Sequence, residues 1–153
     1  MGLPDPKKEH AGIMSKFALR CVTLMDEISK DLEPMLGPGT ADLKIRIGLH
    51  SGPVTAGVLR GEKARFQLFG DTMNTASRME STGLPSRIHV SEDTAALLRI
   101  EGRGCWIEPR EDAVLAKGKG ELKTFWLKKN PPKARYPIPE CPSSTGDSER
   151  RFI

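Results

Sequence analysis

The chain has 153 residues, of which 37% are hydrophobic and 29% are charged, with 24 Lys and Arg against 20 Asp and Glu. This size and composition indicate one soluble globular domain and exclude a collagen, a coiled coil or a highly charged tail. The formal charge of +4 is too small, and its signs too mixed along the chain, to predict a nucleic-acid-binding surface. Aromatic residues make up 5%, which argues against a stacking platform for single-stranded nucleic acid.

Targeting signals and disulfide patterns are absent from the sequence. No stretch of about 18 apolar residues predicts a membrane span, and residues 1–10 lack the apolar core of a signal peptide. Cys21, Cys105 and Cys141 are far apart and odd in number, which favours free thiols in a reducing cytosol. We therefore expect a cytoplasmic domain.

A long amphipathic helix is predicted at the start of the chain. Asp5 is a plausible N-cap, and Pro6 suits the first turn, where its missing N–H leaves no helix bond unmade. The helix is predicted to end at Pro34 and the glycine-rich segment 37–39. Its buried face is predicted by apolar residues at helical spacing: Met14, Phe17, Ala18, Cys21, Met25, Ile28 and Leu32.

Short strands and helices follow. Residues 43–50 alternate between apolar and polar, which predicts a strand with one buried face. Segments 54–59 and 66–69 predict two more strands around a charged turn at 60–64, and a helix over about 73–81 is predicted to be capped by Asp71 and Thr72.

The remaining elements define the fold class. A strand is predicted at 88–90, a helix capped by Ser91 comes next, and strands follow at 105–108 and 121–127. This order predicts an α+β domain over residues 1–129, with helices packed on a mostly antiparallel or mixed sheet. Five of the 12 prolines follow Asn130, so residues 130–153 are predicted to form a Pro-rich disordered tail.

Few residues carry an obvious chemical signal. The sequence has no Walker-type phosphate loop, dinucleotide fingerprint, nucleophile elbow or zinc-protease motif. Asn74 and Arg78 are four residues apart on one predicted helix face, which suits a phosphate clamp or an ordinary exposed face. The Lys117–Gly120 turn could contact a polyphosphate or only solvent. The scattered histidines, His10, His50 and His89, are interpreted as surface or core residues.

The stretch from Leu43 to Leu127 closely resembles the C-terminal half of a class III nucleotidyl cyclase domain, the family of adenylate and guanylate cyclases. The matching segments occur in the family's order and at its spacing, and together they are far more specific than any one alone. They are residues 45–54, 56–58, 69–72, 74–81 and 117–120.

The resemblance implies a purine nucleotide cyclase that works in intracellular signalling. Such domains join head to tail, as homodimers or with a second cyclase domain, and bind GTP or ATP with two Mg²⁺ or Mn²⁺ ions at the interface. The ribose 3′-oxygen attacks the α-phosphorus and pyrophosphate leaves. By position, Asn74 is expected to orient the ribose, Arg78 to stabilise charge on the α-phosphate, and Lys117 to hold the terminal phosphates.

The resemblance places Gln67, with Arg65 nearby, where the family reads the base. Adenylate cyclases commonly carry aspartate at the position of Gln67, and guanylate cyclases carry cysteine. A glutamine amide both donates and accepts hydrogen bonds, so it can pair with either purine. The neighbouring residues favour the guanylate branch, and the choice between GTP and ATP stays open.

The chain departs from the family in its first half. The family's metal-binding aspartates precede the Gly-Leu-Pro that stands here at positions 2–4, so no metal ligand is assigned in this chain. We expect a cyclase fold without its N-terminal strands and helices, exposed sheet edges and apolar helix faces, poor solubility, and no cyclase activity by the chain alone.

Two alternatives to a cyclase portion stay open. The chain could be a non-catalytic dimerisation or regulatory partner of a complete cyclase domain, or the product of an incomplete gene model. The parent protein could place a cytosolic catalytic domain at a membrane anchor that lies outside this sequence.

Overall fold

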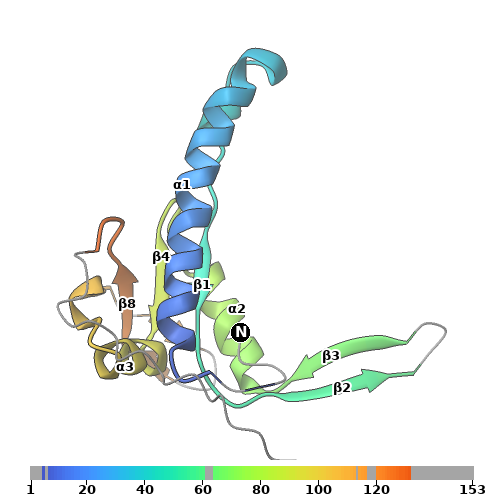
Figure 1. Ribbon diagram of the computed structural model, residues 1–153, viewed down its shortest axis with the longest axis vertical. Helices are drawn as coiled ribbons and strands as arrows, with labels where there is room; N and C mark the ends of the chain where they lie inside the picture. The colour runs from blue at the N-terminus through green and yellow to red at the C-terminus, as the bar shows by residue number, and fades with distance from the viewer. Residues whose placement is uncertain (1–4, 6, 61–63, 113, 117–119, 132–153) are drawn as a thin grey trace, which may run out of the picture.

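The computed structural model describes residues 5, 7–60, 64–112, 114–116 and 120–131. The predicted tail from residue 130 lies almost entirely outside the described residues, as do Pro6, Lys117 and part of the 60–64 turn. The helices in the described part are α1 (His10–Leu36), η1 (Thr40–Asp42), α2 (Asp71–Ser81), α3 (Glu92–Ile100) and η2 (Gly104–Trp106) (Figure 1). The strands are β1 (Ile47–Leu49), β2 (Thr55–Leu59), β3 (Arg65–Phe69), β4 (Ile88–Ser91), β5 (Ile107–Pro109), β6 (Val114–Ala116), β7 (Gly120–Leu122) and β8 (Thr124–Leu127).

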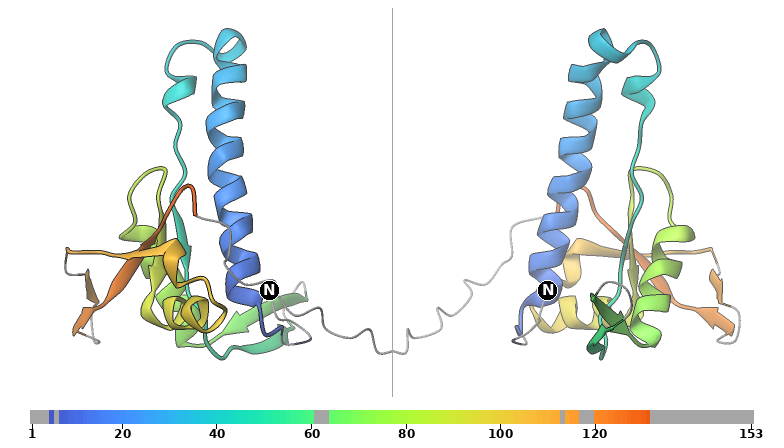
Figure 2. Two further views of the ribbon diagram at one scale, coloured as in Figure 1. Left: turned by 60° about the vertical axis from the view of Figure 1, so that its left-hand side comes forward. Right: turned by 90° about the vertical axis from the view of Figure 1, so that its right-hand side faces the viewer.

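A four-stranded mixed sheet forms the centre of the molecule. Its strand order is β1-β4-β8-β5, with β1 parallel to β4 and the other neighbours antiparallel. Helices α1 and α3 pack on one face of this sheet, and α2 packs on β1 and β4 from the other (Figure 2). The strand pairs β2–β3 and β6–β7 form separate hairpins. The predicted α+β class with a mixed sheet is therefore confirmed.

Alternation along β4 and β8 separates two buried layers. Ile88 and Val90 of β4 belong to the same apolar cluster as Phe125 and Leu127 of β8. Because successive strand residues point to opposite faces, His89 lies on the α2 side. The cluster on the α1 and α3 side also includes Ala11, Ala18, Val22, Leu49, Ala95, Leu98, Trp106 and Ile107.

The first helix differs from its prediction at both ends. It begins at His10 with Glu9 at the N-cap position, so Asp5 is not the cap. Instead, the carboxylate of Glu101 accepts the Gly12 N–H at 2.9 Å, which places a negative charge at the positive end of α1. The helix continues through Pro34, and Gly37 closes it by donating to the carbonyl of Glu33 at 2.9 Å with a φ of 97°.

Several strands differ in extent from their predictions. The strand predicted at 43–50 is regular only at Ile47–Leu49, because the preceding backbone makes few sheet bonds, one of them from Ser86 to Ile45 at 2.8 Å. The segment 121–127 is divided at Lys123 into β7 and β8, and β6 was not predicted. The 105–108 strand begins only at Ile107, after η2.

The buried face predicted for α1 is wrong in part, since Phe17 is 61% and Ile28 49% exposed, whereas several other local predictions are confirmed. Strands β2, β3 and β4 and helices α2 and α3 lie where the sequence placed them. Ser91 caps α3, since its Oγ accepts the Thr94 N–H at 3.4 Å. At α2 the N-cap position is Gly70 with no side-chain cap, so Asp71 and Thr72 lie in the first turn instead.

Apolar side chains are exposed on two projecting parts of the molecule. The distal half of α1 extends beyond the sheet, and the β2–β3 hairpin projects away from the body (Figure 1). The exposed large apolar residues of these parts include Ile28, Met35, Leu36, Val58, Leu59, Phe66 and Phe69. None of the described helices is both long enough and apolar enough to cross a bilayer.

A buried histidine separates α2 from the sheet. His89 is fully buried, its Nδ1 donates to the carbonyl of Met79 at 2.8 Å, and its ring lies 4.8 Å from that of Trp126. Burial lowers the pKa of His89 below its usual 6.5, the bond to Met79 opposes this shift, and the Arg110 cation lowers the pKa further.

Gly48 brings the backbones of β1 and α2 into direct contact. A Cβ added there would collide with the amide nitrogen of Glu80, and that backbone atom cannot rotate away. We expect Gly48→Ala to lower the free energy of unfolding by about 1–3 kcal/mol or more, by overpacking. Gly57→Ala is the matched control, because its Cβ would meet only Phe69 at 3.9 Å, and chemical denaturation measures both. Equal stability of the two variants would contradict this packing.

The His89 pKa predicts a loss of stability in mild acid. In the unfolded chain His89 binds a proton near pH 6.5, whereas in the folded chain it does so only at lower pH. Unfolding therefore takes up a proton between these two pH values. The free energy of unfolding should therefore fall as the pH drops below about 6.5 and level off below the folded pKa. His89→Asn cannot titrate and should flatten this part of a urea-denaturation pH series. An unchanged slope in that variant would refute the assignment.

Candidate active site

The start of α2 is held beside the loop that follows β1. Gly70 joins β3 directly to α2 with a φ of 135°, a backbone conformation that L side chains rarely adopt. The Thr72 hydroxyl donates to the carbonyl of Pro53 at 2.6 Å. The first turn of the helix is thus tied to the chain segment between β1 and β2.

Asn74 and Arg78 lie one turn apart on α2. Thr75 and Met79 form the buried face of the helix, whereas Asn74 is exposed and Arg78 is half-buried. Residues four apart share a helix face, so both side chains leave α2 on the same side, and Nη1 of Arg78 is buried. This pair can bind an anionic ligand with a neutral hydrogen-bonding group beside the charge.

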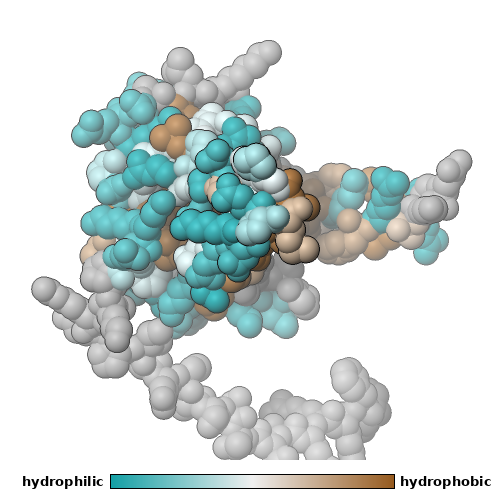
Figure 3. Space-filling model, turned by 90° about the horizontal axis from the view of Figure 1, so that it is seen from above, coloured by the Kyte–Doolittle hydropathy of each residue, from teal (hydrophilic) through white to brown (hydrophobic). Residues whose placement is uncertain are grey.

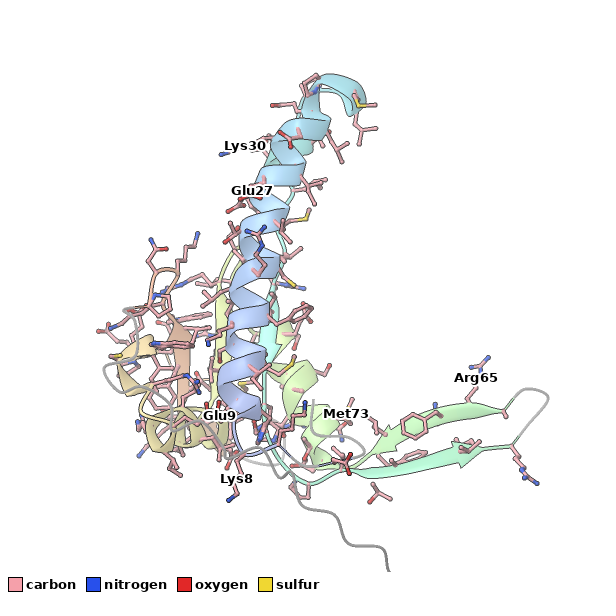
Figure 4. The ribbon with its side chains drawn as sticks, viewed as in Figure 1. Lys8, Glu9, Glu27, Lys30, Arg65 and Met73 are labelled. Atoms are coloured by element: carbon pink, nitrogen blue, oxygen red, sulfur yellow. The ribbon has the colours of Figure 1, made fainter. Side chains whose placement is uncertain are left out.

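The two base-reading candidates lie on the projecting hairpin. Gln67 pairs with Gly57 and Arg65 pairs with Leu59, and both side chains are exposed. Figure 4 shows Arg65 near the outer end of the hairpin and Met73 of α2 at its base. Within one chain, therefore, Arg65 does not lie beside the α2 pair. Lys117 lies outside the described residues.

A cavity of about 670 Å³ lies where β1 and β4 end and the first turns of α2 and α3 begin. Neither Asn74, Arg78 nor Gln67 lines it. Its polar lining includes His50, whose Nδ1 lies 2.8 Å from the Ser91 hydroxyl and 3.6 Å from the Asp93 carboxylate. The sequence interpretation did not single out this lining, although polar residues after two parallel strands are a usable signal for it.

The described residues do not fit a metal site. They contain no group of three or more His, Cys, Asp or Glu side chains placed to hold one ion. His50 and His89 are instead hydrogen-bonded within the packed domain, at Ser91 and Met79 respectively.

Comparison with known proteins agrees with the resemblance in the sequence. Residues 1–129 match the adenylate and guanylate cyclase catalytic domain family. The chain is 61% identical over 85 residues to retinal guanylyl cyclase 2 of Bos taurus, which covers 56% of this chain and 8% of that protein. The match thus spans less than a tenth of the length of this relative.

Two solved structures share the fold. The guanylate cyclase domain of RhGC from Catenaria anguillulae, in complex with GTP, is 37% identical with a TM-score of 0.66 and covers 83% of this chain and 64% of that one. A dimeric guanylyl cyclase domain of the RhoGC fusion protein from Blastocladiella emersonii is 36% identical with a TM-score of 0.61, covering 82% of this chain and 62% of that one. With the family match over most of its length, the chain belongs to the adenylate and guanylate cyclase catalytic domain family.

Proposed function

We propose that this chain supplies the nucleotide-orienting half of a purine nucleotide cyclase site in intracellular signalling. There GTP or ATP is converted to the cyclic 3′,5′-monophosphate and pyrophosphate. The observation that carries the proposal is the Asn74–Arg78 pair on one face of α2. The first turn of this helix is held by the hydrogen bond from Thr72 to Pro53. The family match over residues 1–129 supports it.

Each role that the resemblance implies suits the chemistry of its side chain. The Arg78 guanidinium is a permanent planar cation, and partial burial reduces its screening by water, so it suits charge that builds up on the α-phosphate. The exposed amide of Asn74 can donate to and accept from the ribose hydroxyls. Gln67 is the proposed base contact, with Arg65 beside it, and Lys117 the proposed contact to the terminal phosphates.

A second cyclase domain is proposed to complete the site. The residues that the structure describes offer no metal-ligand set, so two Mg²⁺ or Mn²⁺ ions would be held by the partner in a head-to-tail dimer. The β2–β3 hairpin is the proposed docking arm. Val58 and Phe66 lie opposite each other on one of its faces and are 60% and 66% exposed. Figure 3 shows hydrophobic surface, next to hydrophilic residues, along the projecting part of the molecule.

A blocking partner is the second candidate function. A chain with a docking arm and a nucleotide-binding helix, but with no metal-ligand set among its described residues, could also bind a complete cyclase domain and inhibit its activity. Donation and blocking predict opposite effects on that domain, so one mixing experiment separates them.

Donation by Arg78 is tested by mixing two deficient proteins. The chain is combined with a cyclase domain that retains its metal-binding aspartates but has its own matching arginine replaced by alanine. We expect no cyclic nucleotide from either protein alone and formation of product by the mixture. Arg78→Ala should lower that rate by about 100-fold or more, because a charge-stabilising donor is lost.

The control for this experiment is Arg20→Ala, which removes an exposed arginine from α1. It should leave the rate of the mixture unchanged. Inhibition of a complete cyclase domain, with no product from the deficient pair, would support blocking. Product from the purified chain alone would overturn the need for a partner.

The docking arm is tested by removing its apolar pair. Val58→Ser and Phe66→Ser should each weaken binding to the cyclase partner by about tenfold or more, since each removes a large apolar contact. Ile100→Ser is the matched control, because Ile100 is 82% exposed on α3 and lies outside the hairpin. Analytical ultracentrifugation gives the dissociation constants. Equal binding by all three variants would refute the assignment of the arm.

A further inference from the structure

The last turn of α2 is fixed by two side chains from the sheet. A helix leaves its final carbonyls without partners within the helix. His89 of β4 donates from Nδ1 to the carbonyl of Met79 at 2.8 Å. Arg110, which follows β5, donates from Nη1 to the carbonyl of Thr82 at 2.7 Å. Strand β4 and the residue that follows β5 thus hold the end of this helix.

The same hydrogen bonds determine the state of the histidine. Because Nδ1 carries the hydrogen donated to Met79, Nε2 of neutral His89 is left with a lone pair. Arg110 Nη1 lies 3.4 Å from that nitrogen, and the Arg110 guanidinium lies 4.9 Å from the centre of the Trp126 ring, against which His89 also packs. His89 is fully buried and Trp126 nearly so. The His89 and Trp126 side chains therefore have few alternative arrangements.

This turn is also the part of α2 that carries Arg78. The Thr82 hydroxyl donates to the Arg78 carbonyl at 2.7 Å, and the Thr82 N–H donates to the same oxygen at 3.0 Å. Met79, the next residue, is completely buried. On the other side, the backbone of Gly48 leaves no room for α2 to move toward β1. A shift of this turn would therefore move the Arg78 backbone with it.

We propose that His89 and Arg110 are positioning residues for Arg78: they hold the last turn of α2 so that its guanidinium meets the nucleotide at the correct place. They act through the Met79 and Thr82 carbonyls and do not themselves contact the nucleotide. This inference rests on the proposed function, because it assumes that Arg78 acts in the cyclase reaction.

Two histidine variants separate positioning from simple packing. The amide of asparagine can occupy the place of Nδ1, so His89→Asn retains a donor to Met79. The amide of glutamine reaches the place of Nε2, so His89→Gln loses that donor. Arg110→Met removes the bond to Thr82. If Arg110→Met does not fold, Arg110→Lys, which keeps the charge, is used as the test variant in its place.

Arg87→Met is the matched control. Arg87 lies 4.6 Å from the centre of the same Trp126 ring, but its side chain pairs with Glu108 at 2.5 Å and, among the described residues, makes no hydrogen bond to α2. Its loss should therefore lower stability without moving Arg78. Thermal unfolding of every variant supplies the comparison.

The first readout is turnover by the mixture of the chain and the arginine-deficient cyclase domain. We expect His89→Gln and Arg110→Met to lower kcat by about tenfold or more with KM changed by less than about threefold, since a small displacement costs mainly the reaction step. His89→Asn and Arg87→Met should stay within about threefold of the unmodified chain. Losses of kcat that simply follow the loss of stability, Arg87→Met included, would overturn the proposal.

The second readout does not depend on activity. The Nε–H signal of Arg78 in a nitrogen-15 NMR spectrum, assigned with Arg78→Lys, should shift or broaden in His89→Gln and Arg110→Met but not in Arg87→Met. If the unmodified mixture makes no product, the proposed function fails, and this signal alone judges the positioning. An Arg78 signal unchanged in His89→Gln and Arg110→Met would overturn it.

Discussion

Strand β4 is the constraint on which the rest of the structure depends, because all four of its residues are buried. Its odd and even positions face different layers, so one short strand both closes the α1 and α3 core and contacts α2. A strand covered on both faces must satisfy every polar group that it carries. His89 meets this requirement by donating a hydrogen bond to α2. This bond avoids the free-energy cost of an unsatisfied buried polar group, and it also fixes the position of α2.

Helix α2 is consequently restrained at three places. Thr72 ties its start to Pro53, Gly48 limits its approach to β1, and His89 restrains its end. A helix of 11 residues has little stability of its own, so these tertiary contacts determine where its side chains lie. The backbone positions of Asn74 and Arg78 are thus fixed, although neither residue is fully buried. This suits groups that must meet a ligand without first being ordered by it.

The parts of this fold that could be predicted from sequence have local signals. Ser91 followed by Glu92 and Asp93 predicts a capped helix, and Gly70 predicts a break between strand and helix. The errors arose where distant partners decide the outcome. Asp5 is a good cap by type, yet the α1 terminus receives its carboxylate from Glu101, far along the chain. The sequence left open whether His89 lies on the surface or in the core, and its bond to Met79 depends on packing that no spacing encodes.

The two halves of the proposed nucleotide site differ in how they are held. The phosphate side, at Arg78, rests on a helix restrained by the sheet, so its geometry belongs to this chain. The base side, at Gln67, lies on a hairpin whose residues are mostly exposed on both faces. Few packing contacts fix the angle between such a hairpin and the body of the domain. The proposed partner that covers Val58 and Phe66 would therefore set this angle. Under the proposed function, charge stabilisation by Arg78 would therefore be set by this chain, whereas the choice between GTP and ATP would depend on the partner domain as well as on Gln67.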